Sequence, residues 1–172
     1  MSEGTREPGG EPRGWVGIGL TLLARIALVI AGAALVGMAI VEGWQVYARY
    51  VLNDSPSWTE PVALLLMSTV MMAGAAIGTR SDAHFGFFIA VEYTPVRTRR
   101  GLLAIARLIA AAIGLMLSIW GGRLLVDGWD VPMAGAPLPQ GIVFLPFCFG
   151  GALIALFAIE RLITSPTSRT GE

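Results

Sequence analysis

The chain has 172 residues, of which 55% are hydrophobic and only 14% charged, and its formal net charge is zero. Its mean hydropathy of +0.69 is far above the value expected for a soluble domain of this length. The charge balance gives no reason to expect a nucleic-acid partner. The composition predicts a protein whose apolar surface faces the lipid bilayer.

Four apolar blocks follow one another along the chain, each long enough for the roughly 20 residues that a helix needs to cross a bilayer core. They cover residues of about 20–47, 58–78, 102–126 and 138–163. None alternates with the period of two that a membrane β-barrel would require, which leaves helices as the spanning structure. We therefore expect an all-α integral membrane protein, with four transmembrane helices in a single membrane domain over residues 1–172.

Arginine placement predicts the orientation, because cationic residues accumulate in short cytoplasmic loops. The chain has no lysine, and ten of its twelve arginines lie on one side of the predicted membrane, with only Arg49 and Arg123 on the other. Most tryptophans and tyrosines fall near the arginine-poor interface, as expected for an aromatic belt. We expect both termini to be cytoplasmic, with a flexible amino terminus over residues 1–18 and a tail over residues 164–172.

A cleavable signal peptide is the competing interpretation of the first block, which follows arginines and contains small residues at positions 31–34. The block is longer than an ordinary signal-peptide core. Its removal would leave three spans, which place the termini on opposite sides against the arginine distribution. We therefore interpret the block as a membrane span.

A turn cluster at residues 53–56 separates the first two spans. Ser57 and Glu60 have the spacing of a capping box that begins the second span, which gives Glu60 a purely structural role. Alternatively, Trp58 and Glu60 face a partner at the outer surface. Both interpretations remain open from the sequence.

The connection between the second and third spans is too short and too mixed to cross a membrane. Residues 83–94 combine aromatic side chains with His84 and precede an arginine cluster. Such a segment is typical of an amphipathic stretch that lies in the cytoplasmic interface. The outer connection at residues 127–140 is rich in glycine and proline, so we expect an ordered coil or a short re-entrant turn there.

The sequence lacks the patterns that catalysis or metal binding would need. One histidine and one cysteine cannot form a zinc site or a haem site with two histidine ligands within this chain. No phosphate-binding loop and no nucleophile, histidine and acid set occur. We expect no cofactor, no metal and no enzymatic activity.

Small residues at four-residue spacing allow close helix packing in membranes. The second span contains Gly74 and Gly78, and the third contains a continuous stripe of Ala106, Ala110, Gly114, Ser118 and Gly122. The stripes pack either within this chain or against a helix of another subunit.

Glu42 is the one acidic residue placed well inside a predicted span. A small homo-oligomeric exporter could use such a carboxylate for proton coupling, and we keep this as the alternative function. A self-sufficient transporter should also have a polar centre or broken helices in repeated halves, which the sequence does not indicate. An anchor subunit of a membrane oxidoreductase would require haem-ligating histidines. The chain fits an accessory subunit better.

Three motifs occur in order along the chain: residues 49–53 (RYVLN) close the first span, residues 57–60 (SWTE) open the second, and Arg80 is followed by Ala83 and His84. In this respect the sequence resembles the DctQ-like small membrane subunit of the tripartite ATP-independent periplasmic (TRAP) transporters. The resemblance implies a place in the bacterial inner membrane, with a large permease subunit and a periplasmic solute-binding protein as partners.

The same resemblance implies that the complex imports organic acids such as dicarboxylates on a sodium gradient, and that this chain acts as a scaffold. The candidate interface residues are Arg49, Trp58, Glu60, Gly74, Gly78, Arg80, His84, Gly114 and Ser118.

Overall fold

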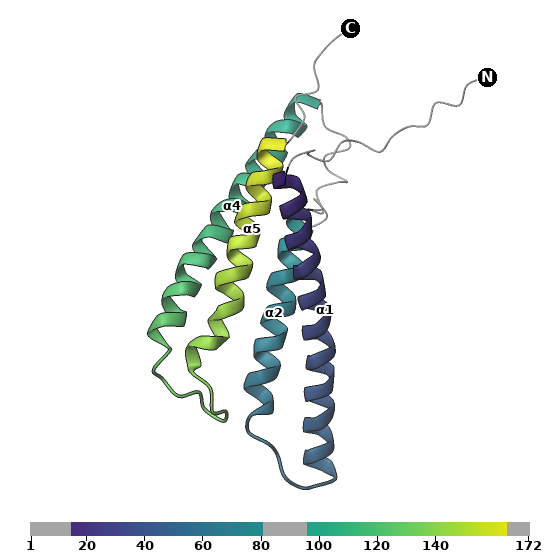
Figure 1. Cartoon of the computed structure of the whole chain (residues 1–172), viewed down its shortest axis with the longest axis vertical. Helices are drawn as coiled ribbons and strands as arrows, with labels where there is room; N and C mark the ends of the chain where they lie inside the picture. Colours follow the sequence, from purple (N-terminus) through teal and green to yellow (C-terminus); the bar gives the residue numbers. More distant parts are fainter. Residues whose placement is uncertain (1–14, 81–95, 165–172) are drawn as a thin grey trace, which may run out of the picture.

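The computed structural model describes residues 15–80 and 96–164, and these residues form two antiparallel helical hairpins (Figure 1). The helices are α1 (Trp15–Tyr50), α2 (Thr59–Arg80), α4 (Val96–Asp127) and α5 (Leu145–Thr164), and the short 3-10 helix η1 (Gln140–Phe144) leads into α5. All four long helices contain a stretch long and apolar enough to cross a membrane, which confirms the predicted fold class.

The helix ends differ from the expected spans. α1 has 36 residues and α4 has 32, or about 54 and 48 Å at 1.5 Å per residue, so both exceed a bilayer core of roughly 30 Å. The fourth apolar block divides at Pro146, which lacks the N–H needed to continue an α-helix. Instead, the N–H of Leu145 bonds to the carbonyl of Ile142, a 3-10 contact.

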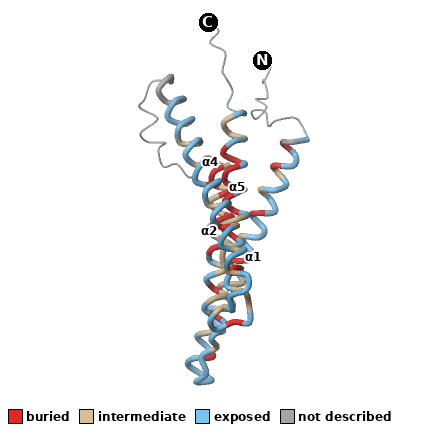
Figure 2. The backbone as a smooth tube through the Cα atoms, turned by 90° about the vertical axis from the view of Figure 1, so that its left-hand side faces the viewer, coloured by how far each residue is buried: buried red, intermediate tan, exposed pale blue. Residues whose placement is uncertain are grey.

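The hairpins pack side by side in the order α1, α2, α5, α4, so α2 and α5 are central. In the apolar stretches of α2 and α5, 39% of residues are buried, against 11% in α1 and 6% in α4. Figure 2 shows the same contrast along the tubes of the four helices. The outer two helices therefore present most of their apolar surface outside the chain's own core.

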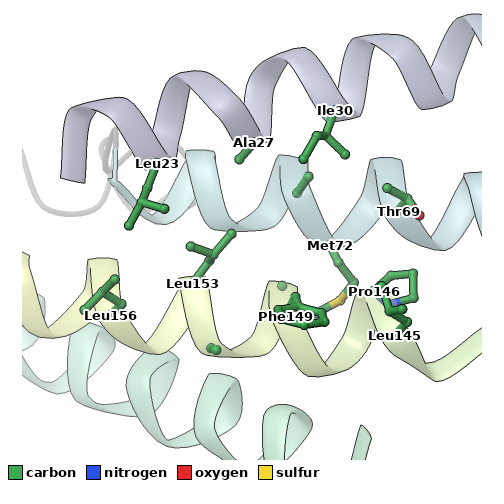
Figure 3. Close-up of a pocket in the computed structure, with 13 residues that line it drawn as sticks. Leu23, Ala27, Ile30, Thr69, Met72, Leu145, Pro146, Phe149, Leu153 and Leu156 are labelled. Atoms are coloured by element: carbon green, nitrogen blue, oxygen red, sulfur yellow. The ribbon is translucent and has the colours of Figure 1, made fainter. Parts of the chain in front are cut away.

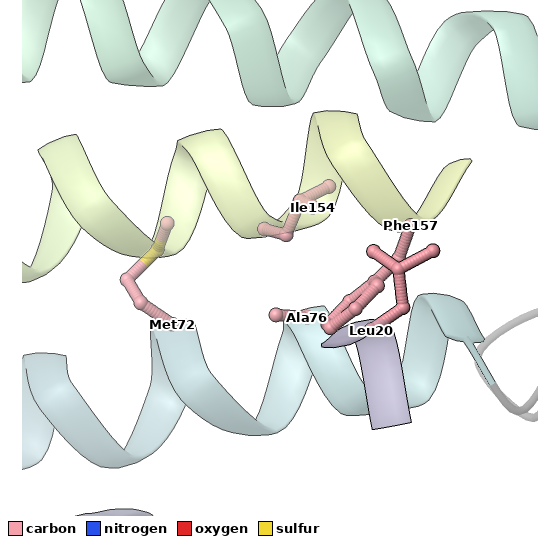
Figure 4. Packing of buried hydrophobic residues seen from close by; sticks show 5 residues of the cluster. All are labelled: Leu20, Met72, Ala76, Ile154 and Phe157. Atoms are coloured by element: carbon pink, nitrogen blue, oxygen red, sulfur yellow. The ribbon is translucent and has the colours of Figure 1, made fainter. Parts of the chain in front are cut away.

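The core lies where α2 and α5 meet the first turns of α1 (Figure 4). Its buried members are Leu20, Met72, Ala76, Ile154 and Phe157. A Cβ atom built on Gly150 would lie 2.6 Å from the Cβ of Met72, so α2 and α5 approach closely only because glycine occupies this position.

The contact surface of α1 is a narrow seam that faces α2. Its less exposed side chains alternate at three- and four-residue intervals, as in a two-helix coiled coil. They include Leu20, Ala24, Ala27, Ala31, Ala34, Met38, Val41, Gln45 and Ala48. Most of the circumference of α1 is left for lipid or a partner.

Candidate functional site

A polar network joins the helices at the end where α1 begins and where α2 and α5 end. Arg80, the last residue of α2, donates a hydrogen bond from Nη2 to Thr21 Oγ1 of α1 at 2.8 Å. Its Nε lies 3.5 Å from Glu160 Oε2 of α5, and both side chains are mostly buried. The guanidinium carbon also lies 5.8 Å from the ring centroid of Phe157, within cation–π range. Arg80 thus links three helices.

Two further arginines extend this network to α4. Arg161 Nε donates to the carbonyl oxygen of Arg80 at 2.6 Å, and Arg107 Nη1 of α4 donates to the carbonyl oxygen of Arg161 at 3.0 Å. These carbonyls belong to the last turns of α2 and α5, where the helix dipoles favour positive charge. All four helices are therefore tied together at this end by charge-assisted hydrogen bonds, each worth about 1.5–3 kcal/mol.

The two predicted small-residue stripes lie in different environments. A Cβ atom built on Gly114 would lie 2.7 Å from the backbone nitrogen of Ala155 and 2.8 Å from the carbonyl oxygen of Gly151, so Gly114 belongs to the chain's own α4–α5 interface. Ser118 lies along the same contact, since its backbone nitrogen would be 2.7 Å from a Cβ atom on Gly151. A Cβ atom on Gly74 would meet nothing within 4 Å. Of the two stripes, only the one on α2 has an open position, at Gly74.

Gly78 is buried, one turn closer than Gly74 to the polar network. Leu64, Met67 and Met71 of α2 are each more than half exposed. This face of α2 is apolar, open at Gly74 and not covered by the described residues.

An apolar groove runs between α1 and α5, with α2 as its floor (Figure 3). Its volume is about 440 Å³, and Thr69 is the only polar side chain in its lining. Leu23 and Ile30 of α1 face Leu156 and Phe149 of α5 across the groove. The hydroxyl of Thr69 donates its proton to its own helix at the carbonyl of Leu65, and the other side chains that line the groove are apolar.

At the opposite end of the molecule the two hairpins are joined by their loops. The Ser57 hydroxyl donates to the carbonyl oxygen of Gly135 at 3.0 Å, and Gly135 has a positive φ of 87°. The capping-box prediction is therefore wrong in its geometry, since α2 begins at Thr59 and Ser57 binds the other loop. Thr59 is fully buried and donates to the carbonyl oxygen of Pro56 at 2.8 Å.

The predicted outer-surface residues are accessible at this end. Trp58 is 40% exposed, Glu60 is exposed in the first turn of α2, and Arg49 is exposed in the last turn of α1. Trp44 and Tyr47 form a tilted aromatic pair on α1, with ring centroids 5.9 Å apart. This end therefore presents aromatic and charged side chains that the described residues leave uncovered.

The helix register places Glu42 less deeply than the sequence suggests. A Cβ atom on Gly37 would lie 3.5 Å from Leu66 Cδ1, which puts these two residues at one level of the antiparallel pair. Glu42 is five residues further along α1, about 7.5 Å, and so level with the first turn of α2 near Pro61. Its side chain is exposed. The exporter alternative would therefore require a second copy of the chain to cover this carboxylate.

His84 and the expected interfacial segment at residues 83–94 lie outside the described residues. Within the described residues, no group of three metal-ligating side chains occurs. The sequence interpretation missed Glu160 and Thr21 as partners of Arg80. The available signal was that Arg80 and Glu160 both lie near the cytoplasmic end of their predicted spans.

Comparison with known proteins gives a match over most of the chain. The family described as "Tripartite ATP-independent periplasmic transporters, DctQ component" matches residues 38–166, from the middle of α1 to just beyond α5. The sialic acid TRAP transporter small permease protein SiaQ of Vibrio cholerae is 25% identical over 109 residues, which cover 63% of this chain and 59% of the relative. This chain thus spans less than two thirds of that relative's length. The chain belongs to the DctQ component family of the tripartite ATP-independent periplasmic transporters and is a multi-pass protein of the bacterial inner membrane.

Proposed function

We propose that this chain is the scaffold subunit of a sodium-driven transporter that imports organic acids delivered by an extracytoplasmic solute-binding protein. In this proposal a larger permease subunit carries the substrate path, and the present chain holds that subunit in the membrane. Both termini are cytoplasmic, so the Ser57–Gly135 end faces outward. The family assignment supports the type of complex, and the geometry supports the role within it.

Two features together support the scaffold role. Hydrogen bonds hold the four helices together at both ends, and much apolar helix surface is not covered by the chain itself. Each of the four long helices contains an 18-residue apolar stretch with at most two charged residues. Most other charged side chains of the described residues lie toward the helix ends, although Arg25, Glu42 and Arg107 lie two to three turns inside α1 and α4. α1 and α4 bury little of themselves, and the face of α2 around Gly74 is open. Helices in membranes associate through van der Waals contact at small residues, because lipid removes the hydrophobic driving force. An open glycine on a central helix therefore fits a partner helix.

The substrate class follows from the family resemblance and is kept broad. Dicarboxylates are the example that the resemblance suggests, whereas the name of the Vibrio cholerae relative specifies sialic acid. Both are organic acids. The test is uptake by proteoliposomes that contain this chain, the large permease and the binding protein, with a panel of radiolabelled organic acids. We expect uptake of at least one acid with an inward sodium gradient and none when potassium replaces sodium.

The scaffold role is tested by co-purification of the large permease with Gly74→Leu. We expect recovery to fall several-fold, because the new side chain would occupy the open position on α2. The matched control is Gly101→Leu, which adds the same side chain at another open position, near the start of α4. Equal recovery for wild type and Gly74→Leu would remove Gly74 from the partner interface.

A further inference from the structure

The loop that joins α4 to η1 forms a crevice beyond the ends of these two helices. Its volume is about 260 Å³, and its lining includes Trp129, Asp130, Pro132, Pro137 and Pro139. Trp129 is 55% exposed. On the proposed topology this loop lies at the outer end of the molecule, outside the bilayer core. Tryptophan is among the residues enriched at interaction hot spots, and here it lines a hollow together with a carboxylate.

This crevice is pre-organised. The N–H of Gln140 donates to the carbonyl of Val131 at 2.8 Å, and the N–H of Met133 donates to the carbonyl of Leu138 at 2.9 Å. An isolated antiparallel bridge pairs residues 132 and 139, and the Ser57 hydrogen bond ties the loop to the start of α2. A loop fixed in this way loses little conformational entropy when a partner binds.

The loop carries net negative charge. Asp127 and Asp130 are exposed, and the sequence has no basic residue between Arg123 and Arg161. The ion pair between Arg80 and Glu160 lies at the other end of the molecule. A lipid phosphate would be repelled here, whereas a guanidinium or ammonium group could contact the carboxylate and the face of the indole together.

We propose that this crevice receives a basic side chain of the extracytoplasmic solute-binding protein, with Trp129 as the aromatic platform and Asp130 as the counter-charge. The inference rests on the proposed function, because it takes the binding protein as the partner that reaches this face. It adds where contact occurs on this chain and which chemistry the partner contributes.

The test measures binding of the purified solute-binding protein of the proposed transporter to the complex with the large permease in nanodiscs, at several salt concentrations. We expect Trp129→Ala to weaken binding about tenfold, the effect of losing one hot-spot contact. Asp130→Asn should weaken it several-fold and flatten its salt dependence, because the removed interaction is screened by salt. Asp54→Asn, which removes an exposed carboxylate from the other outer loop, is the matched control and should bind like wild type.

The outcomes separate this inference from the proposed function. If the wild-type complex binds the solute-binding protein and both crevice variants bind equally well, the crevice proposal is wrong and the proposed function stands. If the wild-type complex does not bind it at all, the proposed function fails and the crevice proposal fails with it. Loss of the large permease from Trp129→Ala complexes would show that the crevice serves that subunit, which also overturns the proposal.

Discussion

Gly114 gives the sharpest test of how α4 is held against α5. A Cβ atom at this position would lie 2.7–2.8 Å from backbone atoms of α5, whereas ordinary carbon contacts are about 3.5–4.0 Å. Even Gly114→Ala therefore requires the two helices to separate by roughly 1 Å. Gly74→Ala adds the same methyl group where nothing lies within 4 Å. Both variants replace a helical glycine by alanine, so the gain in helix propensity is the same in each and cancels in the comparison.

The expected magnitude follows from overpacking, which costs about 1–3 kcal/mol. For a chain of this size each kcal/mol lowers the thermal midpoint by about 2–4 °C, so Gly114→Ala should unfold roughly 2–12 °C below Gly74→Ala. The assay can use Cys148, the single cysteine, because a Cβ atom on Gly122 would lie 3.6 Å from its sulfur, which places the thiol at the same interface. A fluorogenic thiol reagent would then report the opening of α4 from α5 on heating.

Equal midpoints for Gly114→Ala and Gly74→Ala would refute the reasoning, since they would mean that α4 does not approach α5 at backbone distance. A lower midpoint for both variants would mean that Gly74 is also packed within the isolated chain. In that case the open face on α2 would not exist as described, and the partner interface proposed there would lose its support.

Three further predictions concern the polar network, the topology and the carboxylate of α1. Arg80→Ala should destabilise the isolated chain by about 2–3 kcal/mol in a thermal unfolding assay, because it removes the ion pair to Glu160 and a hydrogen bond to α1. Glu160→Gln leaves the hydrogen bond from Arg80 to α1 and should therefore destabilise the chain less. A larger destabilisation by Glu160→Gln than by Arg80→Ala would contradict the central role of Arg80. A cysteine at Asn53 should react with an impermeant maleimide in intact cells and one at Thr98 only after permeabilisation; labelling of the second from outside would overturn the proposed topology. Glu42→Gln should leave sodium-driven uptake by the reconstituted complex within a few-fold of wild type, and loss of uptake in an intact complex would favour the exporter alternative.

The sequence is sufficient to predict the number and type of the membrane-spanning helices among the described residues, because unbroken apolar blocks depend only on local composition. It could not tell which helices are central. In a soluble protein the apolar face of a helix marks its buried side, but lipid is as apolar as the core, so that signal is lost in a membrane. On α1 the seam is marked by side-chain size instead, with alanines at positions 27, 34 and 48.

The sequence predicts the candidate site only in part, because the contacts of several site residues depend on helix order and register. Gly74 and Gly114 have similar sequence surroundings, and only the helix order decides that one is open and the other packed. The depth of Glu42 depended on the register between α1 and α2, which a single sequence does not contain. Arg80 was identified through its motif, but its partner Glu160 is 80 residues away and required the α2–α5 contact.

The two ends of the molecule together explain how an open array of four helices can be stiff. Apolar contact alone discriminates weakly between packed helices and helices surrounded by lipid. The hairpins are joined at one end by the contacts of Arg80 with Glu160 and Arg161 and at the other by the bond from Ser57 to Gly135. Between these points α2 and α5 touch where Gly150 meets Met72. A hinge between the hairpins would require breaking one of the polar ends, so the array should move as one body, which is the mechanical property that a scaffold for a moving partner needs.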